Sequence, residues 1–218
     1  MLPLRSLRLR PPSELQSAVF PYSVPTIRSL GELAFPSAVT FFVGENGSGK
    51  STLLEAIAAA SGLPSVGSEL RVDADETLAA QRTLATAITL IWRAARARRG
   101  FFLRAEDFFG FTRTIARMRA AFLVEQAAID EEYRDRSDHA RALRLGPIAA
   151  SLRDMEARYG VDLDANSHGQ SFLKLFQSRF APNGLYLLDE PEAPLSPQSQ
   201  LAFMAMLTDM VAQSSQFI

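Results

Sequence analysis

The segment Gly44–Thr52 constrains the fold of this chain more than any other part of its sequence. It reads GENGSGKST and matches the phosphate-binding pattern G-x-x-x-x-G-K-[ST]. An apolar run at 38–43 precedes it and a helical run at 53–60 follows it, which is the strand–loop–helix order that such a loop requires. The segment therefore predicts a nucleoside-triphosphate site within an α/β fold.

Each part of the segment has a chemical role in that site. Glycines let backbone N–H groups turn inward around a phosphate, and the N-terminus of the following helix adds positive potential. We expect Lys50 to reach the β- and γ-phosphates and the Ser51 hydroxyl to ligate Mg²⁺. The loop residues expected to bind ATP are Gly44, Glu45, Asn46, Gly47, Ser48, Gly49, Lys50, Ser51 and Thr52.

The composition narrows the classes of protein to which the chain can belong. Its 218 residues, 47% of them hydrophobic, are enough for one sizeable core or a core with a subdomain attached. A net charge of −1 provides no global field toward nucleic acid or membranes, and the absence of cysteine excludes disulfides and thiolate metal sites. No apolar stretch approaches the roughly 18 to 20 residues that span a bilayer, and the start lacks a signal-peptide core. These features predict a cytoplasmic protein without a transmembrane segment.

The remaining apolar patterns predict both strands and helices. Residues 1–43 read as strands and turns broken by prolines, and apolar residues at helical spacing predict a helix over about 76–99. Gly100 ends that helix, and residues 101–103 read as a short buried strand. A long amphipathic helix is expected over 111–133, with more helix to about Tyr159. Further expected elements are helices at 172–180 and 201–211 and a strand beginning at 216.

A second strand, at 184–190, ends in two carboxylates. Four apolar residues run into Asp189 and Glu190, which suits a strand buried on both faces of a parallel sheet. In the Walker B pattern, a carboxylate at this position holds Mg²⁺, and we expect Glu190 to polarise the attacking water. Taken alone, such a string is often just the end of a strand, and the phosphate loop is what favours the catalytic interpretation.

A third segment, Ser167-His168-Gly169-Gln170, opens the helical run at 172–180. Alone it could be an ordinary Ser/Gly helix cap. With the phosphate loop and the Leu-Leu-Asp-Glu-Pro string, in this order and spacing, it resembles the signature segment of the ABC-class ATPases. Within that class, the chain is similar over about residues 18–218 to small, stand-alone bacterial predicted ATPases that are often labelled AAA-family ATPases.

The resemblance implies the overall architecture. The expected fold is α/β of the P-loop NTPase type: a mostly parallel sheet flanked by helices, with an antiparallel N-terminal β part and an inserted helical subdomain. We expect a single ABC-type domain over 1–218. Its parts would be the N-terminal β part with the phosphate loop (1–75), a mainly helical subdomain (76–165), and the signature helix, Walker B strand and C-terminal helix (166–218).

The resemblance also implies a composite ATP site. Two copies of the chain would form a head-to-tail homodimer, and the signature residues of one copy, Ser167, Gly169 and Gln170, would face the ATP held by the Lys50 loop of the other. Lys50 and Glu190 would then be the catalytic residues, and the expected cofactors are ATP and Mg²⁺.

Other residues are assigned by their place in the family pattern. Glu106 stands near the position of the family's Q-loop glutamine and would contact Mg²⁺ together with Ser51 and Asp189. An aromatic residue before the loop would stack on adenine, and Tyr22 is preferred to Phe20 for this role, although either could belong to the core. The family's switch histidine would fall a few residues beyond Ile218, so the resemblance predicts either a chain cut short before it or an enzyme that lacks this contact to the γ-phosphate.

The predicted function is that of a soluble ATPase in which ATP-dependent dimerisation acts on a macromolecular partner, either nucleic acid or protein. DNA is a candidate because the helical middle is rich in arginine, although a solvated helix surface explains the same residues. The alternatives are the nucleotide-binding subunit of a membrane transporter and a non-hydrolysing ATP sensor. The arginines in question are Arg93, Arg96, Arg98, Arg99, Arg104, Arg113, Arg117 and Arg119.

Overall fold

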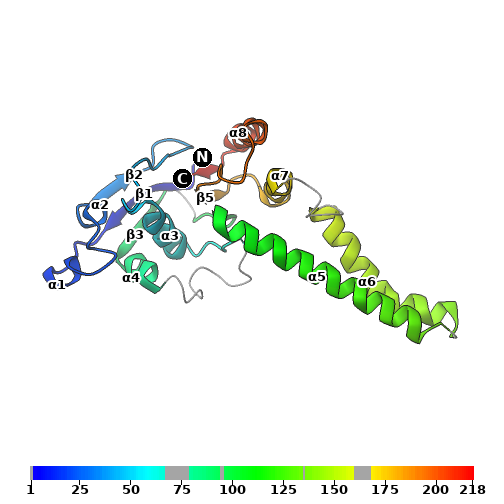
Figure 1. The fold of residues 1–218 in the computed structure, drawn as a ribbon. Helices are drawn as coiled ribbons and strands as arrows, with labels where there is room; N and C mark the ends of the chain where they lie inside the picture. Colours follow the sequence, from blue (N-terminus) through cyan, green and yellow to red (C-terminus); the bar gives the residue numbers. More distant parts are fainter. Residues whose placement is uncertain (1, 67–78, 94–95, 135, 160–167) are drawn as a thin grey trace.

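The protein is a mixed α/β structure with two three-stranded sheets and a long helical hairpin (Figure 1). The computed structural model describes residues 2–66, 79–93, 96–134, 136–159 and 168–218. One sheet is antiparallel with the order β2-β1-β3, and the other is parallel with the order β4-β5-β6. Eight helices lie within the described residues.

The antiparallel sheet is built around β1 (Leu4–Leu9). This strand pairs with β2 (Glu32–Ala34) on one side and with β3 (Ile88–Trp92) on the other. Its leucines are buried and its arginines are exposed. Ser6 and Leu7 are both buried, so the regular alternation of a strand is interrupted here, and the register with β3 shifts between Leu4 and Ser6. The expected antiparallel N-terminal β part is therefore present, but it also recruits a strand from the middle of the chain.

That third strand corrects the expectation of a continuous helix over 76–99. Helix α4 (Ala79–Ala87) ends at Ala87, and the chain continues directly as β3. The run Ile-Thr-Leu-Ile-Trp has apolar residues at helical spacing, but β-branched and aromatic residues also favour strands. Pairing with β1 at five register positions decides in favour of the strand.

The parallel sheet confirms the two buried strands that the apolar runs predict. β4 (Gly100–Arg104) pairs with β5 (Leu185–Asp189), and β5 pairs with β6 (Gln216–Phe217). Successive side chains of β5 enter two different cores, with Leu185 in one and Tyr186 in the other. Both faces of the sheet are therefore covered, which is why these strands are continuously apolar.

Gly100 allows β4 to approach β5 closely. Its φ is +135°, and a Cβ atom at this position would lie 1.8 Å from the carbonyl oxygen of Leu185. Any other residue would therefore force the two backbones apart at this end of the pair.

The run at 38–43 is not the regular strand that the sequence predicts. Val39 forms a single parallel bridge with Phe217, and the Thr40 N–H donates to the Phe217 carbonyl at 3.0 Å. No further bridge of this run is present within the described residues. Phe41 and Val43 are 80% and 91% exposed. Two short helices, α1 (Glu14–Ser17) and α2 (Pro25–Arg28), also replace part of the expected strand and turn structure at 1–43.

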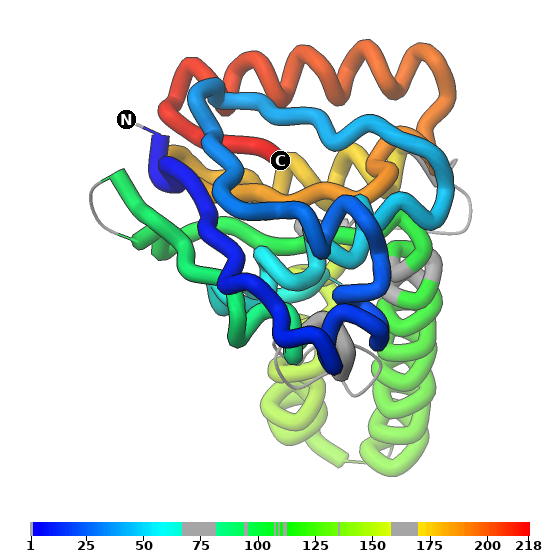
Figure 2. The backbone as a smooth tube through the Cα atoms, turned by 90° about the vertical axis from the view of Figure 1, so that its left-hand side faces the viewer, coloured from blue at the N-terminus to red at the C-terminus, as the bar shows by residue number. Residues whose placement is uncertain are grey.

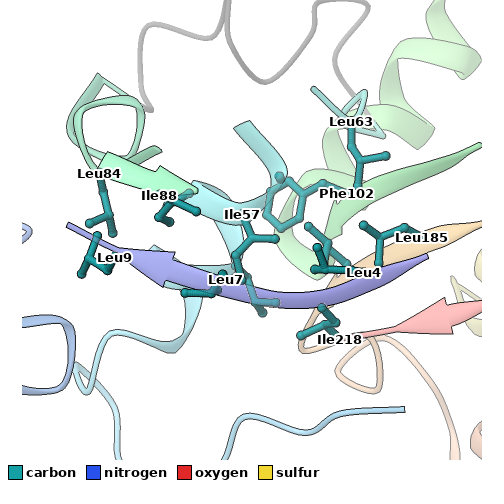
Figure 3. Close-up of a cluster of buried hydrophobic side chains, with 14 of the residues drawn as sticks. Leu4, Leu7, Leu9, Ile57, Leu63, Leu84, Ile88, Phe102, Leu185 and Ile218 are labelled. Carbon is teal, nitrogen blue, oxygen red and sulfur yellow. The ribbon is translucent and has the colours of Figure 1, made fainter. Parts of the chain in front are cut away.

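Two hydrophobic cores cover the faces of the parallel sheet. The first lies between this sheet, the antiparallel sheet and α3 (Lys50–Ser61), and Figure 3 shows Leu4, Ile57 and Leu185 within it. The second joins the opposite face to α7 (His168–Arg179) and α8 (Pro197–Ala212). It is rich in aromatic rings: Phe101, Phe108, Phe172, Phe176, Tyr186, Phe203 and Phe217.

The helical hairpin confirms the long helices expected in the middle of the chain. It consists of α5 (Ala105–Glu132) and α6 (Asp138–Tyr159), which pack through Ile129, Ile148 and Leu152. The hairpin extends away from the sheets in both views (Figures 1 and 2). Among the helices of the described residues, none has the length and apolarity needed to cross a bilayer.

Gln216 links the two sheets through its side chain. Its amide oxygen accepts a hydrogen bond from the Leu4 N–H at 2.8 Å, and its amide nitrogen donates to the Leu4 carbonyl at 3.0 Å. The residue is completely buried. This amide therefore provides for the peptide of Leu4 what a neighbouring strand would otherwise provide.

Candidate nucleotide-binding site

The phosphate loop leads directly into α3, and its glycines have the conformations that this turn requires. Gly47 and Gly49 have φ values of +80° and +94°, in the left-handed region that favours glycine. At Gly49 a Cβ atom would also lie 3.0 Å from the Cγ1 atom of Val24. The loop therefore needs glycine at position 49 for two independent reasons.

Lys50 folds back across the loop. Its ammonium group donates hydrogen bonds to the carbonyl oxygens of Gly44 at 2.8 Å and Glu45 at 2.9 Å. An ammonium group has three donors, so two of them hold the loop and one is left for an anion. Helix α3 has twelve residues and begins at Lys50, so its N-terminal N–H groups lie at the loop. They add positive potential for a phosphate there.

The segment 24–27 packs against the loop and hydrogen-bonds to it. This segment was not identified from the sequence. The Thr26 hydroxyl donates to the Ser48 carbonyl, while Val24 and Ile27 pack against Gly49. Pro25 at the first position of α2 was the available signal, since proline is favoured there.

The carboxyl ends of β4 and β5 bring the predicted acidic residues to the first turn of α3. The Ser51 hydroxyl lies close enough to the Asp189 carboxyl to lower its pKa. Arg104 is the register partner of Asp189 across the parallel pair, and Glu106 follows it in the first turn of α5. The motif residues Ser51 and Asp189, far apart in the sequence, therefore lie in the same part of the fold.

Glu190 has an unusual backbone conformation. Its φ is +49°, in a region that non-glycine residues rarely occupy, and its side chain is exposed. Conformations of this kind are concentrated at functional sites, where surrounding structure maintains them. Here the turn is closed by a hydrogen bond from the Ala193 N–H to the Glu190 carbonyl at 3.0 Å.

The electrostatics of this edge favour a cation. Burial raises the pKa of the Asp189 carboxyl above its ordinary value, and the Ser51 hydroxyl opposes that rise. Glu190 and Glu106 raise the pKa further through like-charge repulsion, whereas Arg104 lowers it. The hydroxyl of Ser51 and the carboxylate of Asp189 are oxygen donors of the kind that Mg²⁺ prefers, so the residues present fit the expected ion.

A buried ion pair adjoins this group, and sequence reasoning missed it. Arg104 Nη1 lies 3.0 Å from Glu55 Oε1, and the two side chains are only 16% and 6% exposed. Glu55 belongs to α3, where it is a single carboxylate among leucines and alanines. A lone charge in an otherwise apolar helix run was the signal that could have identified it.

The aromatic residue preferred for adenine stacking lies in the core. Tyr22 is 4% exposed and belongs to the main hydrophobic cluster, so its ring face is not available to a base. Phe20, the alternative, is 49% exposed. The structure therefore favours Phe20 over Tyr22, because a stacking residue must present a ring face to the ligand.

The signature segment is described in part. Ser167 lies outside the described residues, while Gly169 and Gln170 lie in the first turn of α7 and Gln170 is exposed. Ser196 is the N-cap of α8 and accepts a hydrogen bond from the Ser199 N–H at 3.3 Å.

Comparison with known proteins agrees with a nucleotide-binding class. A family model described as an AAA domain matches residues 26–116, a range that contains the phosphate loop, α3 and β4. This match covers less than half of the chain and supports a P-loop ATPase family, whose members generally bind ATP with Mg²⁺. No curated protein and no solved structure matches the chain significantly.

Proposed function

We propose that the protein is an ABC-class ATPase that binds and hydrolyses Mg²⁺-ATP between two copies of the chain. The observation that carries this proposal is the arrangement that brings Ser51 and Glu55 of α3 to Asp189 and Arg104 at the ends of β5 and β4. It joins the helix that follows the phosphate loop to the strand that ends in two carboxylates. P-loop ATPases hold the Mg²⁺ of their nucleotide between residues of these two kinds.

The loop residues would bind and orient the triphosphate. The backbone N–H groups at the start of α3 and the free donor of Lys50 supply hydrogen bonds to phosphate oxygens. The Ser51 hydroxyl and Asp189 carboxylate would hold Mg²⁺, which when bound would neutralise charge on the β- and γ-phosphates. Phe20 would contact the base from the exposed side of the segment that precedes α2.

Glu190 would act on the attacking water. Its carboxylate directly follows Asp189 and is exposed, so it can accept a hydrogen bond from a water beside the γ-phosphate and then its proton. Glutamine at this position keeps the shape and loses the proton acceptor. Hydrolysis should therefore depend on Glu190 much more strongly than binding does.

The exposure of the site supports a second copy of the chain as part of it. Residues 44–47 and Glu190 are all exposed, so one protomer leaves bound phosphates open to water on that side. In the ABC-class arrangement, Ser167, Gly169 and Gln170 of the second copy would cover this side. ATP would then hold two copies together, and hydrolysis would release them.

The charge distribution favours a protein over DNA as the macromolecular partner. Residues 105–159 contain nine arginines against ten aspartates and glutamates, so the hairpin carries no positive excess. Arg93 and Arg96 donate to the carbonyls of Phe35 and Ser61, which commits them to the fold. The hairpin instead exposes apolar side chains that a protein partner could cover: Met118, Leu123, Val124 and Leu143.

The test compares fluorescent-ATP binding, phosphate release and sedimentation for the natural chain and two variants. Lys50→Ala should weaken ATP binding by about 10- to 100-fold, the range for losing a hydrogen bond to a charged group. Lys174→Ala, which changes the other lysine of the chain, is the matched control and should bind ATP normally. Glu190→Gln should bind ATP, release phosphate slowly and sediment as an ATP-dependent dimer.

Each part of the proposal can fail separately in this experiment. Undiminished affinity in Lys50→Ala would refute the loop assignment. Unchanged phosphate release in Glu190→Gln would refute the role of that carboxylate. A monomer at every ATP and Mg²⁺ concentration would refute the composite site.

A further inference from the structure

Arg104 lies beside the residues expected to bind Mg²⁺ and is paired with helix α3. Ser51 and Glu55 are four residues apart on α3 and therefore lie on one face of the helix. Glu55 pairs with Arg104, and the Ser51 hydroxyl lowers the pKa of Asp189. Arg104 and Asp189 are neighbours across the β4–β5 pair. One face of α3 therefore lies against the ends of both strands.

The environment of this ion pair differs from that of an exposed pair elsewhere in the protein. Arg8 and Glu32 also approach to 3.0 Å, but their side chains are 64% and 48% exposed. Arg104 and Glu55 are 16% and 6% exposed at the same distance. Exposed pairs are easily rearranged, whereas removing one member of a buried pair leaves an uncompensated charge. The guanidinium of Arg104 is therefore held in one place.

That fixed guanidinium also faces Glu106. Arg104 Nε lies 3.7 Å from Glu106 Oε1, on the edge opposite the nitrogen that contacts Glu55. The Glu106 side chain is 77% exposed, so little else restricts its rotamers. A planar guanidinium can engage two carboxylates in fixed directions, which the point charge of a lysine cannot do.

We propose that Arg104 is a positioning residue for the Mg²⁺ site: Glu55 anchors its guanidinium, and the guanidinium holds Glu106 and the end of β4 beside Asp189. This inference rests on the proposed function. The Arg104–Glu55 pair would then do more than join α3 to β4. It would also orient the carboxylates of Glu106 and Asp189 toward Mg²⁺-ATP. Arg104 is also the N-cap residue of α5. Holding Arg104 in place therefore also fixes where α5 begins.

The experiment measures the affinity of a fluorescent ATP analogue in EDTA and across a Mg²⁺ titration, with thermal unfolding as a check on folding. In Arg104→Gln the affinity in EDTA should stay within about twofold of the natural chain. The Mg²⁺ concentration for half-maximal enhancement should rise by about tenfold or more, as is typical when an outer residue of a metal site is lost. Arg8→Gln, which breaks the exposed pair, should leave both quantities unchanged.

Arg104→Lys separates positioning from simple fastening. Lysine keeps the positive charge beside Glu55 and should recover most of the thermal stability lost in Arg104→Gln. If Arg104 positions Glu106, the Mg²⁺ titration of Arg104→Lys should remain shifted. If lysine restores the titration, or if Arg104→Gln never shifts it, the inference is overturned and the pair is only structural.

Failure of the proposed function gives a different result. A natural chain that binds the ATP analogue neither in EDTA nor with Mg²⁺ would overturn both proposals. A natural chain with Mg²⁺-enhanced binding that all three variants share would overturn this inference alone.

Discussion

Replacing Gln216 by leucine measures how strongly the two sheets are joined. The buried amide exchanges two hydrogen bonds with the peptide of Leu4, and leucine has a similar size but no polar atoms. Two buried backbone groups left without partners cost about 4 kcal/mol together, and burial of a leucine side chain offsets about 2 kcal/mol of this. We therefore expect Gln216→Leu to lower the free energy of unfolding by about 2 kcal/mol.

The natural fluorescence of the protein suits this measurement. Trp92 is the single tryptophan of the chain and the register partner of Leu4 across β1 and β3. Urea unfolding is followed by Trp92 emission and by far-UV circular dichroism. In both measurements the midpoint urea concentration should fall by about 1 M, for a slope of about 2 kcal/mol/M. Gln177→Leu, at an exposed position of α7, is the matched control and should change stability by less than about 0.5 kcal/mol.

A second substitution, Gln216→Glu, tests the same link through the pH dependence of the free energy of unfolding. The carboxyl group in Gln216→Glu can always accept from the Leu4 N–H, but it can donate to the Leu4 carbonyl only when protonated. Burial favours the protonated form, so the stability lost at neutral pH should be partly regained as the pH falls. A loss below about 0.5 kcal/mol in Gln216→Leu, or no pH dependence in Gln216→Glu, would refute this account of the link.

Three further predictions concern the parallel sheet. Gly100→Ala should cost more than about 4 kcal/mol or prevent folding because its Cβ atom meets the facing strand, whereas Gly110→Ala, which has open space beside α5, should stabilise by about 0.5–1 kcal/mol; similar melting temperatures for the two variants would contradict this contrast. In EDTA, Asp189→Asn should be more stable than the natural chain by an amount that grows as the pH rises above 3.8, because burial raises the pKa of this carboxyl and its ionised form destabilises the fold; thermal unfolding between pH 4 and 8 tests the sign. Tyr186→Phe should lose about 1–3 kcal/mol in urea unfolding, since the buried hydroxyl both donates to and accepts from the peptide groups of Ala181, and an unchanged midpoint would show that these bonds contribute nothing.

The parts of the fold that were predictable have a strong local pattern. The phosphate loop needs glycines and a lysine at fixed spacing, and the apolar run before Asp189 needs a sheet covered on both faces. The helical interpretation of 88–92 was wrong because apolar spacing alone cannot separate a short strand from a buried helix turn. The choice was made by β1, which lies about eighty positions earlier in the chain.

The candidate site was predictable in its motif residues and hidden in its supporting contacts. Ser51 and Asp189 have identities that indicate their chemistry, and in the structure the Ser51 hydroxyl lies close enough to lower the pKa of Asp189. The Arg104–Glu55 pair depends on the register of β4 and β5 against α3, which no local pattern specifies. Tyr22 illustrates the same limit, because whether an aromatic ring is buried or presented to a ligand depends on packing by distant segments.

The link between Leu4 and Gln216 has a consequence for how the protein reaches its fold in the cell. The two residues are 212 positions apart, and the bridge between Val39 and Phe217 spans almost as much of the chain. At roughly 5–20 residues per second, a ribosome needs about 10–40 s to complete that separation. During this interval the antiparallel sheet can already form, because β2 and β3 precede residue 93, but the Leu4 peptide and Val39 still lack their partners in β6. The nascent chain should therefore acquire protease resistance in two steps, with the joining of the two sheets as the later one.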